Sequence, residues 1–153
     1  MSYKFRFDEK KCTGCFACHT ACLDAHYGPG EEGVSLRSIK RIVAESKSFQ
    51  KDVCPGCIHC GACARACPCG ALLADEDTGI VLARQALCSG CRACESACPV
   101  QVIRFDREGR IVKCDGCLTR LKAGREPACV RACPTGAVTV EEERESDERE
   151  TDG

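Results

Sequence analysis

The sequence predicts an α+β protein of two small modules, each built from short helices and β-hairpins. Three observations lead to this prediction. Cysteines recur in four runs with similar close spacing, and the residues that close each run favour one short helix. Pairs of short apolar segments around a turn, typical of β-hairpins, follow two of the runs. The unit of run, helix and hairpin repeats about every 30 residues, except for an insertion between the first and second runs, and such a repeat constrains the architecture.

The cysteine runs indicate metal clusters. The third run has the spacing C-x2-C-x2-C-x3-C followed by proline, with which bacterial ferredoxins hold [4Fe–4S] clusters. The second run has the same spacing and proline, the first lacks the proline, and the fourth is stretched in its middle. In chain order the runs are Cys12, Cys15, Cys18 and Cys22; Cys57, Cys60, Cys63 and Cys67; Cys88, Cys91, Cys94 and Cys98; and Cys114, Cys117, Cys129 and Cys133. Four runs predict four [4Fe–4S] clusters, tandem bacterial ferredoxin-like modules related by pseudo-symmetry, and a function in electron transfer.

The spacing within a run suits a cubane cluster. Three cysteines separated by two residues each can surround one face of the cube, and small residues such as Gly61 and Gly90 let the loop close. The fourth cysteine follows one helical turn after the third, and in two-cluster ferredoxins it binds the other cluster. The proline after it fixes φ and ends the helix. The runs therefore predict pairs of clusters that the chain bridges.

A cysteine count of 18 among 153 residues also fits a disulfide-rich protein or a zinc protein. A disulfide framework needs a secreted chain, and residues 1–9 contain no apolar stretch of the signal-peptide type. Zinc sites usually combine two separated pairs of ligands, not four clustered cysteines followed by proline. A zinc-stapled interaction module is therefore the least favoured functional hypothesis.

Charge is unevenly distributed along the chain. Residues 141–153 hold eight acids and two arginines, so the totals of 22 basic and 23 acidic residues leave 20 against 15 in the body. This surplus would offset clusters that carry about −2 each with their thiolates. No basic stripe with interleaved aromatics indicates nucleic-acid binding, and no apolar segment is long enough to span a membrane. We expect a cytoplasmic protein, unless a partner that bears a signal exports it.

The N-terminal third predicts two strands and a helix. Residues 3–8 alternate between aromatic and charged side chains, which predicts a half-buried strand. A short helix is expected over Cys18–Ala25, a loop over 27–36 and a strand over Ser38–Glu45. The polar segment Lys47–Asp52 predicts a turn into the second cysteine run.

The rest of the chain predicts two hairpins and a final strand. Apolar segments flank turns that end at glycine, which predicts hairpins over 71–83 and 102–113. The strand Ala137–Val140 has no partner after it, so Tyr3–Phe7 is its natural partner, and this pairing brings the first and fourth runs together. The predicted domains are an outer module of residues 1–52 plus 114–140, an inner module of residues 53–113, and an acidic tail, 141–153, expected to be disordered.

The fourth run and its surroundings, Lys113–Ala137, resemble the last motif of the four-cluster iron–sulfur subunits of the dimethyl-sulfoxide-reductase and formate-dehydrogenase type. The first run, followed by His26 and a strand near Ser38–Val43, is also similar to the small ferredoxin-like subunits of tungsten aldehyde oxidoreductases. The segment Cys57-Ile-His-Cys60 is similar to the second motif of both groups. The resemblance covers residues 3–140.

The resemblance implies which cysteines share a cluster, because that family pairs the first motif with the fourth and the second with the third. The implied ligand sets are Cys12, Cys15, Cys18 and Cys133; Cys22, Cys114, Cys117 and Cys129; Cys57, Cys60, Cys63 and Cys98; and Cys67, Cys88, Cys91 and Cys94. The family often has more residues between the second and third cysteines of its second motif. Cys54-Pro-Gly-Cys57 therefore offers an alternative register in which Cys60 is not a ligand.

Two cysteines, Cys54 and Cys69, remain outside these sets and are not expected to be ligands. We expect each to be a small buried residue beside a cluster; the alternative is a replacement ligand or a redox-sensitive thiol. The histidines His19, His26 and His59 are expected to lie beside the clusters or at the surface, because each run already supplies four sulfurs.

The resemblance implies an electron-transfer subunit of a larger oxidoreductase with a molybdenum or tungsten pterin site, of the aldehyde-oxidoreductase or formate-dehydrogenase type. A flavin or ferredoxin protein would be the other electron partner. The chain has no Walker loop and no credible nicotinamide or flavin motif, so no catalytic site of its own is expected. A subunit of a hydrogenase or formate–hydrogen-lyase complex, or a free polyferredoxin, is the alternative, and self-association is compatible with clusters near both surfaces.

Overall fold

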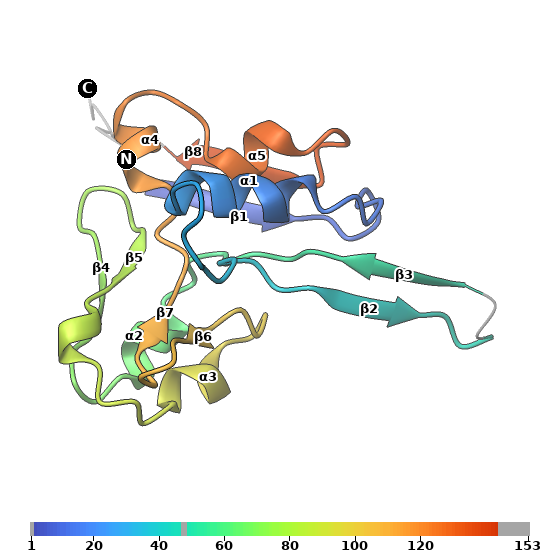
Figure 1. Ribbon diagram of the computed structural model, residues 1–153. Helices are drawn as coiled ribbons and strands as arrows, with labels where there is room; N and C mark the ends of the chain where they lie inside the picture. The colour runs from blue at the N-terminus through green and yellow to red at the C-terminus, as the bar shows by residue number, and fades with distance from the viewer. Residues whose placement is uncertain (1, 47–48, 144–153) are drawn as a thin grey trace, which may run out of the picture.

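The computed structural model describes residues 2–46 and 49–143. Within these ranges the chain forms short helices and four two-stranded antiparallel sheets, an α+β arrangement that agrees with the prediction (Figure 1). In chain order the elements are β1 (Ser2–Phe7), α1 (Ala17–His26), β2 (Lys40–Val43), β3 (Gln50–Val53), α2 (Ala62–Ala66), β4 (Leu72–Ala74), β5 (Val81–Ala83), the 3-10 turn η1 (Gln85–Leu87), α3 (Ala93–Ala97), β6 (Arg104–Phe105), β7 (Ile111–Val112), α4 (Leu118–Lys122), α5 (Ala128–Ala132) and β8 (Val138–Glu143).

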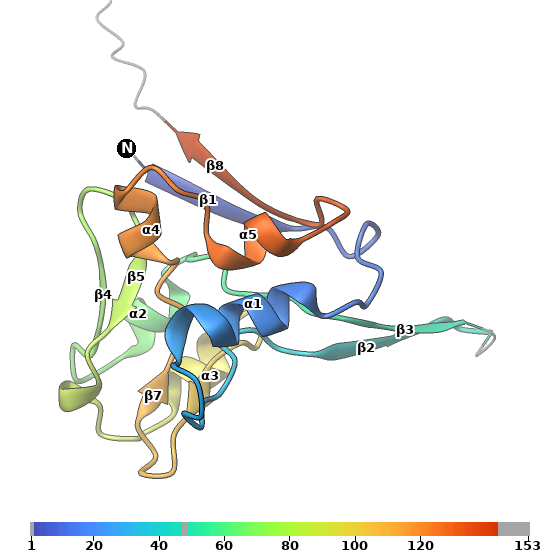
Figure 2. The ribbon, with the colours of Figure 1, turned by 45° about the horizontal axis from the view of Figure 1, so that its top comes forward.

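Strands β1 and β8 join the two ends of the described chain, and the predicted pairing is confirmed. The register aligns Phe5 with Val140 and Phe7 with Val138. Phe5 and Val138 are buried, because alternate side chains of a strand point to the same face of the sheet. Helices α1 and α5 lie side by side and in contact in both ribbon views (Figures 1 and 2). The first and fourth cysteine runs therefore become neighbours.

The acidic tail begins later than predicted. Glu141–Glu143 belong to β8, so the prediction of disorder is wrong for these three residues. These residues pair with Ser2–Lys4 of β1, and β1 supplies complementary charges, since Lys4 pairs with Glu143 at 2.7 Å and Arg6 with Glu141 at 3.2 Å. Residues 144–153, the rest of the predicted tail, lie outside the described residues.

Strands β2 and β3 form a hairpin that projects away from the body (Figure 1). The strand predicted over Ser38–Glu45 is found as the shorter β2, but the predicted turn over Lys47–Asp52 is wrong, because β3 begins at Gln50. The physical reason is that the hairpin has little core to face, so β3 lacks the apolar alternation of a half-buried strand. A cross-strand pair supports it instead, with Arg41 Nε donating to Asp52 Oδ1 at 2.8 Å.

The two other predicted hairpins are confirmed with shorter strands, β4 with β5 and β6 with β7. Leu72, Val81, Ile103 and Ile111 form a small apolar core between them and helices α2 and α3. The turn residue Ile80 is fully buried and packs against Phe5 of β1 and Leu121 of α4. This contact connects residues 53–113 to the two ends of the chain.

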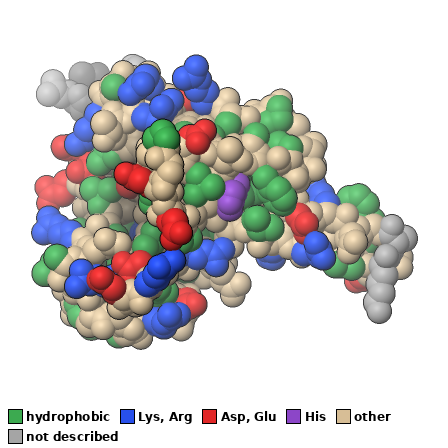
Figure 3. All heavy atoms as spheres, viewed as in Figure 1, with side chains coloured by type: hydrophobic (Ala, Val, Ile, Leu, Met, Phe, Trp, Pro, Cys, Tyr) green, Lys and Arg blue, Asp and Glu red, His purple; other side chains and the backbone are tan. Residues whose placement is uncertain are grey.

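The helices of the described ranges are short, with ten residues in α1 and five in each of the others. None of them is long and apolar enough to cross a membrane. Acidic and basic side chains are interspersed over the face shown in Figure 3.

Helices of five residues are unstable in isolation. Their positions therefore depend on the loops and on what the loops bind.

Candidate metal-cluster sites

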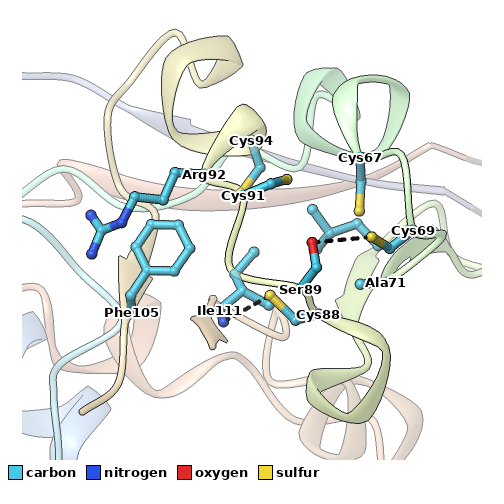
Figure 4. A pocket seen from close by; sticks show the side chains of 11 residues that line it. Cys67, Cys69, Ala71, Cys88, Ser89, Cys91, Arg92, Cys94, Phe105 and Ile111 are labelled. Carbon is cyan, nitrogen blue, oxygen red and sulfur yellow. Dashed lines mark hydrogen bonds between the residues drawn. The ribbon is translucent and has the colours of Figure 1, made fainter. Parts of the chain in front are cut away.

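Three cavities in the described part of the chain each collect four of the predicted ligands, three from one cysteine run and one from another. One cavity is shown in Figure 4, where the cysteines surround an apolar space backed by Ile111. The cysteine sets are Cys67, Cys88, Cys91 and Cys94; Cys12, Cys15, Cys18 and Cys133; and Cys57, Cys60, Cys63 and Cys98.

The remaining four predicted ligands are Cys22, Cys114, Cys117 and Cys129, from α1, α5 and the loop before α4. Burial, against the opposing charge of Arg37 and with smaller contributions from nearby Cys117 and Cys22, raises the pKa of Cys129 to about 11. Burial also raises the pKa of Cys114, with a contribution from Cys57 of the second run. The four thiols therefore lie within electrostatic reach of one another, next to the site that contains Cys57.

The loops of the first three runs share a backbone conformation that is typical of anion-binding sites. In the first three runs, the residues just before and just after the second cysteine both have positive φ. These pairs are Gly14 (73°) and Phe16 (57°), His59 (53°) and Gly61 (81°), and Gly90 (76°) and Arg92 (62°). Alternation of left- and right-handed residues turns successive N–H groups to one side, as in the anion-binding nests of many iron–sulfur sites.

At Gly14, glycine is required for a second reason besides the positive φ. A Cβ built on Gly14 would lie 2.5 Å from the carbonyl oxygen of Asp52, at the base of the β2–β3 hairpin. The first run therefore packs against the hairpin through a glycine.

Backbone N–H groups already donate to the cysteine sulfurs in the described chain. The N–H of His59 donates to Cys57 Sγ at 3.3 Å, and the N–H of Gly116 donates to Cys114 Sγ at 3.3 Å. The N–H of Ile111 donates to Cys88 Sγ at 3.4 Å. Hydrogen bonds to the sulfurs stabilise thiolate charge and are one determinant of iron–sulfur reduction potentials.

Two buried side-chain nitrogens have no hydrogen-bond partner within the described ranges, Arg37 Nε and His59 Nε2. Nδ1 of His59 accepts the N–H of Val81 at 3.1 Å, so the proton of the neutral ring lies on Nε2. Burial, and to a smaller extent the positive charge of Lys113, lowers the pKa of His59 to about 3, which keeps the ring neutral. A Cβ on Gly116 would lie 3.3 Å from Nε2, so this donor faces the fourth run. Unpaired buried donors are costly, and a cluster sulfur is a suitable acceptor.

The alternatives of zinc and disulfides can be compared with this geometry. All 18 cysteines, which lie within the described ranges, are free thiols. Four thiolates on one zinc ion at about 2.3 Å would place their sulfurs about 3.8 Å apart. Among the described residues, only His26, Asp115 and Cys117 bring three candidate donor atoms within 4.8 Å of one another. The cysteine sets are too open for single zinc ions and fit a larger group, with the sulfur chemistry of [4Fe–4S] clusters.

Cys54 and Cys69 line cavities without completing a run. Cys54 is buried in the cavity of the first run, where it lowers the pKa of Cys18 to about 6 through a hydrogen bond. It therefore lies in a different cavity from Cys57 and Cys60, which gives no support to the alternative register. Cys69 borders the cavity in Figure 4 but is exposed, so the expectation of burial is wrong for it. Its Sγ contacts Ser89 Oγ at 3.2 Å, at the edge of the cavity.

The histidines lie beside the cysteine runs, and one forms a charged pair. His26 is bound through Nε2 to Asp115 Oδ1 at 2.9 Å and through Nδ1 to the carbonyl of Cys22 at 2.8 Å. Hydrogen bonds to Asp115, the largest cause, and to Cys22 raise the pKa of His26 to about 11. Both ring nitrogens therefore act as donors. His19 Nδ1 lies 4.0 Å from Cys54 Sγ. His26 therefore joins α1 to the loop of the fourth run.

Sequence reasoning missed two buried cations at the sites, Arg37 and Lys113. Lys113 directly precedes Cys114, which was an available signal, whereas Arg37 lies between the predicted loop, 27–36, and the predicted strand, Ser38–Glu45. Burial alone would lower the pKa of Arg37, but the thiolates of Cys129 and Cys18 outweigh it and raise the value.

A family model described as the 4Fe-4S dicluster domain matches residues 45–143, well over half of the chain. The chain belongs to this family. Membership of this family indicates that the cavities lined by cysteine sulfurs are iron–sulfur sites. The resemblance to iron–sulfur subunits of the dimethyl-sulfoxide-reductase type is confirmed. The presence of [4Fe–4S] clusters and a role in electron transport follow from the family and the cysteine sets.

Relatives in this family are similar over most of the chain. The B subunit of the anaerobic dimethyl sulfoxide reductase of Haemophilus influenzae is 38% identical, with 89% of this chain and 72% of the relative covered. The subunit of the same name from Escherichia coli K12 is 36% identical, with 89% and 71% covered. The NrfC protein of Escherichia coli K12 is 39% identical, with 91% and 65% covered.

Proposed function

We propose that this chain is an electron-transfer subunit that carries four [4Fe–4S] clusters in two ferredoxin-like modules. The observation that carries the proposal is the composition of the three cavities. Each combines three cysteines of one run with the last cysteine of the run that the family pairs with it. The fourth set, at the contact of α1 and α5, completes the same scheme.

The proposed ligand sets divide the chain into the outer module, residues 1–52 plus 114–140, and the inner module, residues 53–113. Cys12, Cys15, Cys18 and Cys133 define site 1; Cys22, Cys114, Cys117 and Cys129 define site 2; Cys57, Cys60, Cys63 and Cys98 define site 3; and Cys67, Cys88, Cys91 and Cys94 define site 4. The bound clusters would supply one-electron oxidation and reduction. The chain supplies the thiolates, the N–H donors and the apolar walls beside the sulfurs.

The neighbouring positions of sites 2 and 3 support a continuous path. Cys57 of site 3 is close enough to Cys114 of site 2 to raise its pKa. Within each module, the last cysteine of one run reaches the other run's cavity, so two sites share a helix. The order of the path is therefore site 1, site 2, site 3 and site 4.

The proposed partner is a larger catalytic subunit. Two relatives are named as the B subunit of a dimethyl sulfoxide reductase, which identifies them as one component of an oxidoreductase. We propose a molybdenum or tungsten pterin enzyme as the partner, of the aldehyde-oxidoreductase or formate-dehydrogenase type, and a flavin or ferredoxin protein at the other end of the path.

The cluster content is tested by anaerobic reconstitution of the full chain with iron and sulfide. We expect about sixteen iron atoms and sixteen sulfides per chain and no zinc. About eight iron atoms would overturn the four-cluster proposal, and zinc without iron would overturn the electron-transfer function.

The partner is tested by anaerobic isolation of the native complex through a tag on this chain, followed by identification of each subunit and metal. A large subunit with molybdenum or tungsten is the expected result. A nickel-containing partner would indicate a hydrogenase complex instead, and a monomer that exchanges electrons with several enzymes would indicate a free carrier.

A further inference from the structure

Only two lysine or arginine side chains are buried in the described part of the chain. Arg37 is 6% exposed and Lys113 is 7% exposed. Neither forms an ion pair with a carboxylate among the ion pairs of the described residues. A buried charge without a counter-charge is strongly unfavourable, so each cation needs a negative group nearby.

Lys113 lies at the contact between sites 2 and 3. Its Nζ donates to the carbonyls of Val81 at 2.8 Å and Cys114 at 2.9 Å, and it lies 3.4 Å from His59 Nδ1. Lys113 also lines the cavity of Cys57, Cys60, Cys63 and Cys98. Its ammonium group is thus held between the cavity of site 3 and the first ligand of site 2.

Arg37 has the corresponding position between sites 1 and 2. Its guanidinium donates to the carbonyl of Cys54, a residue that lines the cavity of site 1. It is within electrostatic reach of Cys18 of site 1 and of Cys129 of site 2. Gly56 allows this position, because a Cβ there would meet the guanidinium.

Among the residues that the structure describes, no buried cation lies at the contact between sites 3 and 4. The space between their cysteines is filled by Leu72, Val81, Ile103 and Ile111. Arg92 lines the cavity of site 4, but its guanidinium stacks on Phe105 at 4.4 Å and its side chain is 56% exposed. Solvent screens an exposed charge far more than a buried one.

We propose that Arg37 and Lys113 set the reduction potentials along the path, raising those of the clusters in sites 1, 2 and 3 relative to the cluster in site 4. The proposal rests on the proposed four-cluster function. Each cluster gains one electron and one negative charge on reduction, with no bond made or broken. A fixed positive charge in a low-dielectric surrounding stabilises the reduced form. Site 2 is adjacent to both cations, so its potential is the highest and that of site 4 is the lowest.

The main test is Lys113→Gln, which removes the charge but keeps an amide donor for the two carbonyls. In the reconstituted full chain, we expect the ratio of reduced to oxidised cluster at a fixed potential to fall about tenfold at sites 2 and 3, about 59 mV for a one-electron couple. Site 4 is the internal reference and should not shift. The readout is a potentiometric titration followed by electron paramagnetic resonance, with iron content measured on the same samples.

Two matched variants separate charge from structure. Lys113→Arg retains the charge and should keep the potentials of sites 2 and 3 near their original values. Lys40→Met removes an exposed lysine of β2 and should shift no potential. The corresponding variant Arg37→Gln should lower the potentials of sites 1 and 2 and leave sites 3 and 4 unchanged.

The order of potentials in the unmodified chain provides a measurement that needs no cation variant. Cys91→Ser alters the signal of site 4 and thereby identifies it, and we expect that cluster to have the lowest potential. The proposal would be overturned if a cluster other than that of site 4 had the lowest potential. It would also be overturned if Lys113→Gln or Arg37→Gln, with full iron content, left all potentials unchanged or shifted all four equally. Failure of the proposed function is distinguishable, because the unmodified chain would then bind fewer than about sixteen iron atoms.

Discussion

The proposed outer and inner modules carry the same kind of cysteine run on frameworks of different strength. The outer module has five-residue helices in α4 and α5, but it also has ten residues in α1 and six in β1, which pairs with all six residues of β8 up to Glu143. The strands of the inner module have three or two residues, and its helices have five. Hairpins of this size are not independently stable. The comparison indicates that the inner module depends more on its clusters for folding, since metal–ligand bonds replace a larger apolar core.

The largest expected effect comes from loss of a cluster in one module at a time. Cys94→Ala removes a buried ligand of site 4 and Cys129→Ala one of site 2, and each should lower the iron content from about sixteen to about twelve. We expect Cys94→Ala to abolish amide-exchange protection in β4–β7, whereas Cys129→Ala should leave the β1–β8 pair protected. Mass spectrometry of amide exchange measures this difference.

The control for these variants is Cys69→Ser, since Cys69 is exposed and not a proposed ligand. It should retain about sixteen iron atoms. Unchanged iron content in Cys94→Ala would contradict the ligand assignment. Equal loss of protection in both modules for both variants would contradict the comparison itself.

The contact between the modules provides the next test. Ile80 of the inner module is fully buried against Phe5 and Leu121 of the outer module. Ile80→Ala should lower the free energy of unfolding by about 2–5 kcal/mol, because it leaves a cavity between them. Anaerobic urea denaturation of the reconstituted chain measures the change, and two separate transitions in place of one would show that the modules have become uncoupled.

The matched control is Leu73→Ala, a neighbouring apolar residue of β4 that is 46% exposed. Its effect should stay within about 0.5 kcal/mol. An effect of Ile80→Ala as small as this one would mean that the modules are held together by other contacts.

What could be predicted from the sequence also differs between the modules. The inner module follows directly from its motifs, because each run is contiguous and each hairpin is local. The pairing of Tyr3–Phe7 with the last strand was predictable because both segments alternate and neither has another partner. The strand that begins at Gln50 was not predictable from the sequence, because a projecting hairpin needs no apolar face. Arg37 could not be recognised as a site residue, because its burial between two sites depends on long-range packing.

Gly14 of the first run and Gly90 of the third run have equivalent positions, so they allow the two modules to be compared at a single loop residue. A Cβ at Gly14 would lie 2.5 Å from the Asp52 carbonyl oxygen, and one at Gly90 would lie 2.9 Å from that of Gly109. Both have positive φ, so alanine costs about 1–2 kcal/mol at either position before any clash. We expect Gly14→Ala to exceed Gly90→Ala in loss of stability, because its contact is tighter.

Gly136→Ala is the control for these two, since Gly136 also has positive φ but no neighbour within 4 Å of its Cβ position. It should show only the conformational cost. Urea midpoints and iron content, measured together, distinguish a strained loop from a lost cluster. Equal effects at Gly14 and Gly136 would mean that the first run does not need its close contact with the hairpin.

The smallest expected effect concerns the end of the β1–β8 sheet, the element that most distinguishes the outer module. Lys4 and Glu143 pair at 2.7 Å, but their side chains are 55% and 46% exposed. Solvent and salt weaken such a pair, so a double-mutant cycle with Lys4→Ala and Glu143→Ala should give a coupling of about 0.2–1 kcal/mol that decreases in high salt. A larger, salt-independent coupling would mean that charge pairing, rather than burial of Phe5 and Val138, holds the two ends of the chain together.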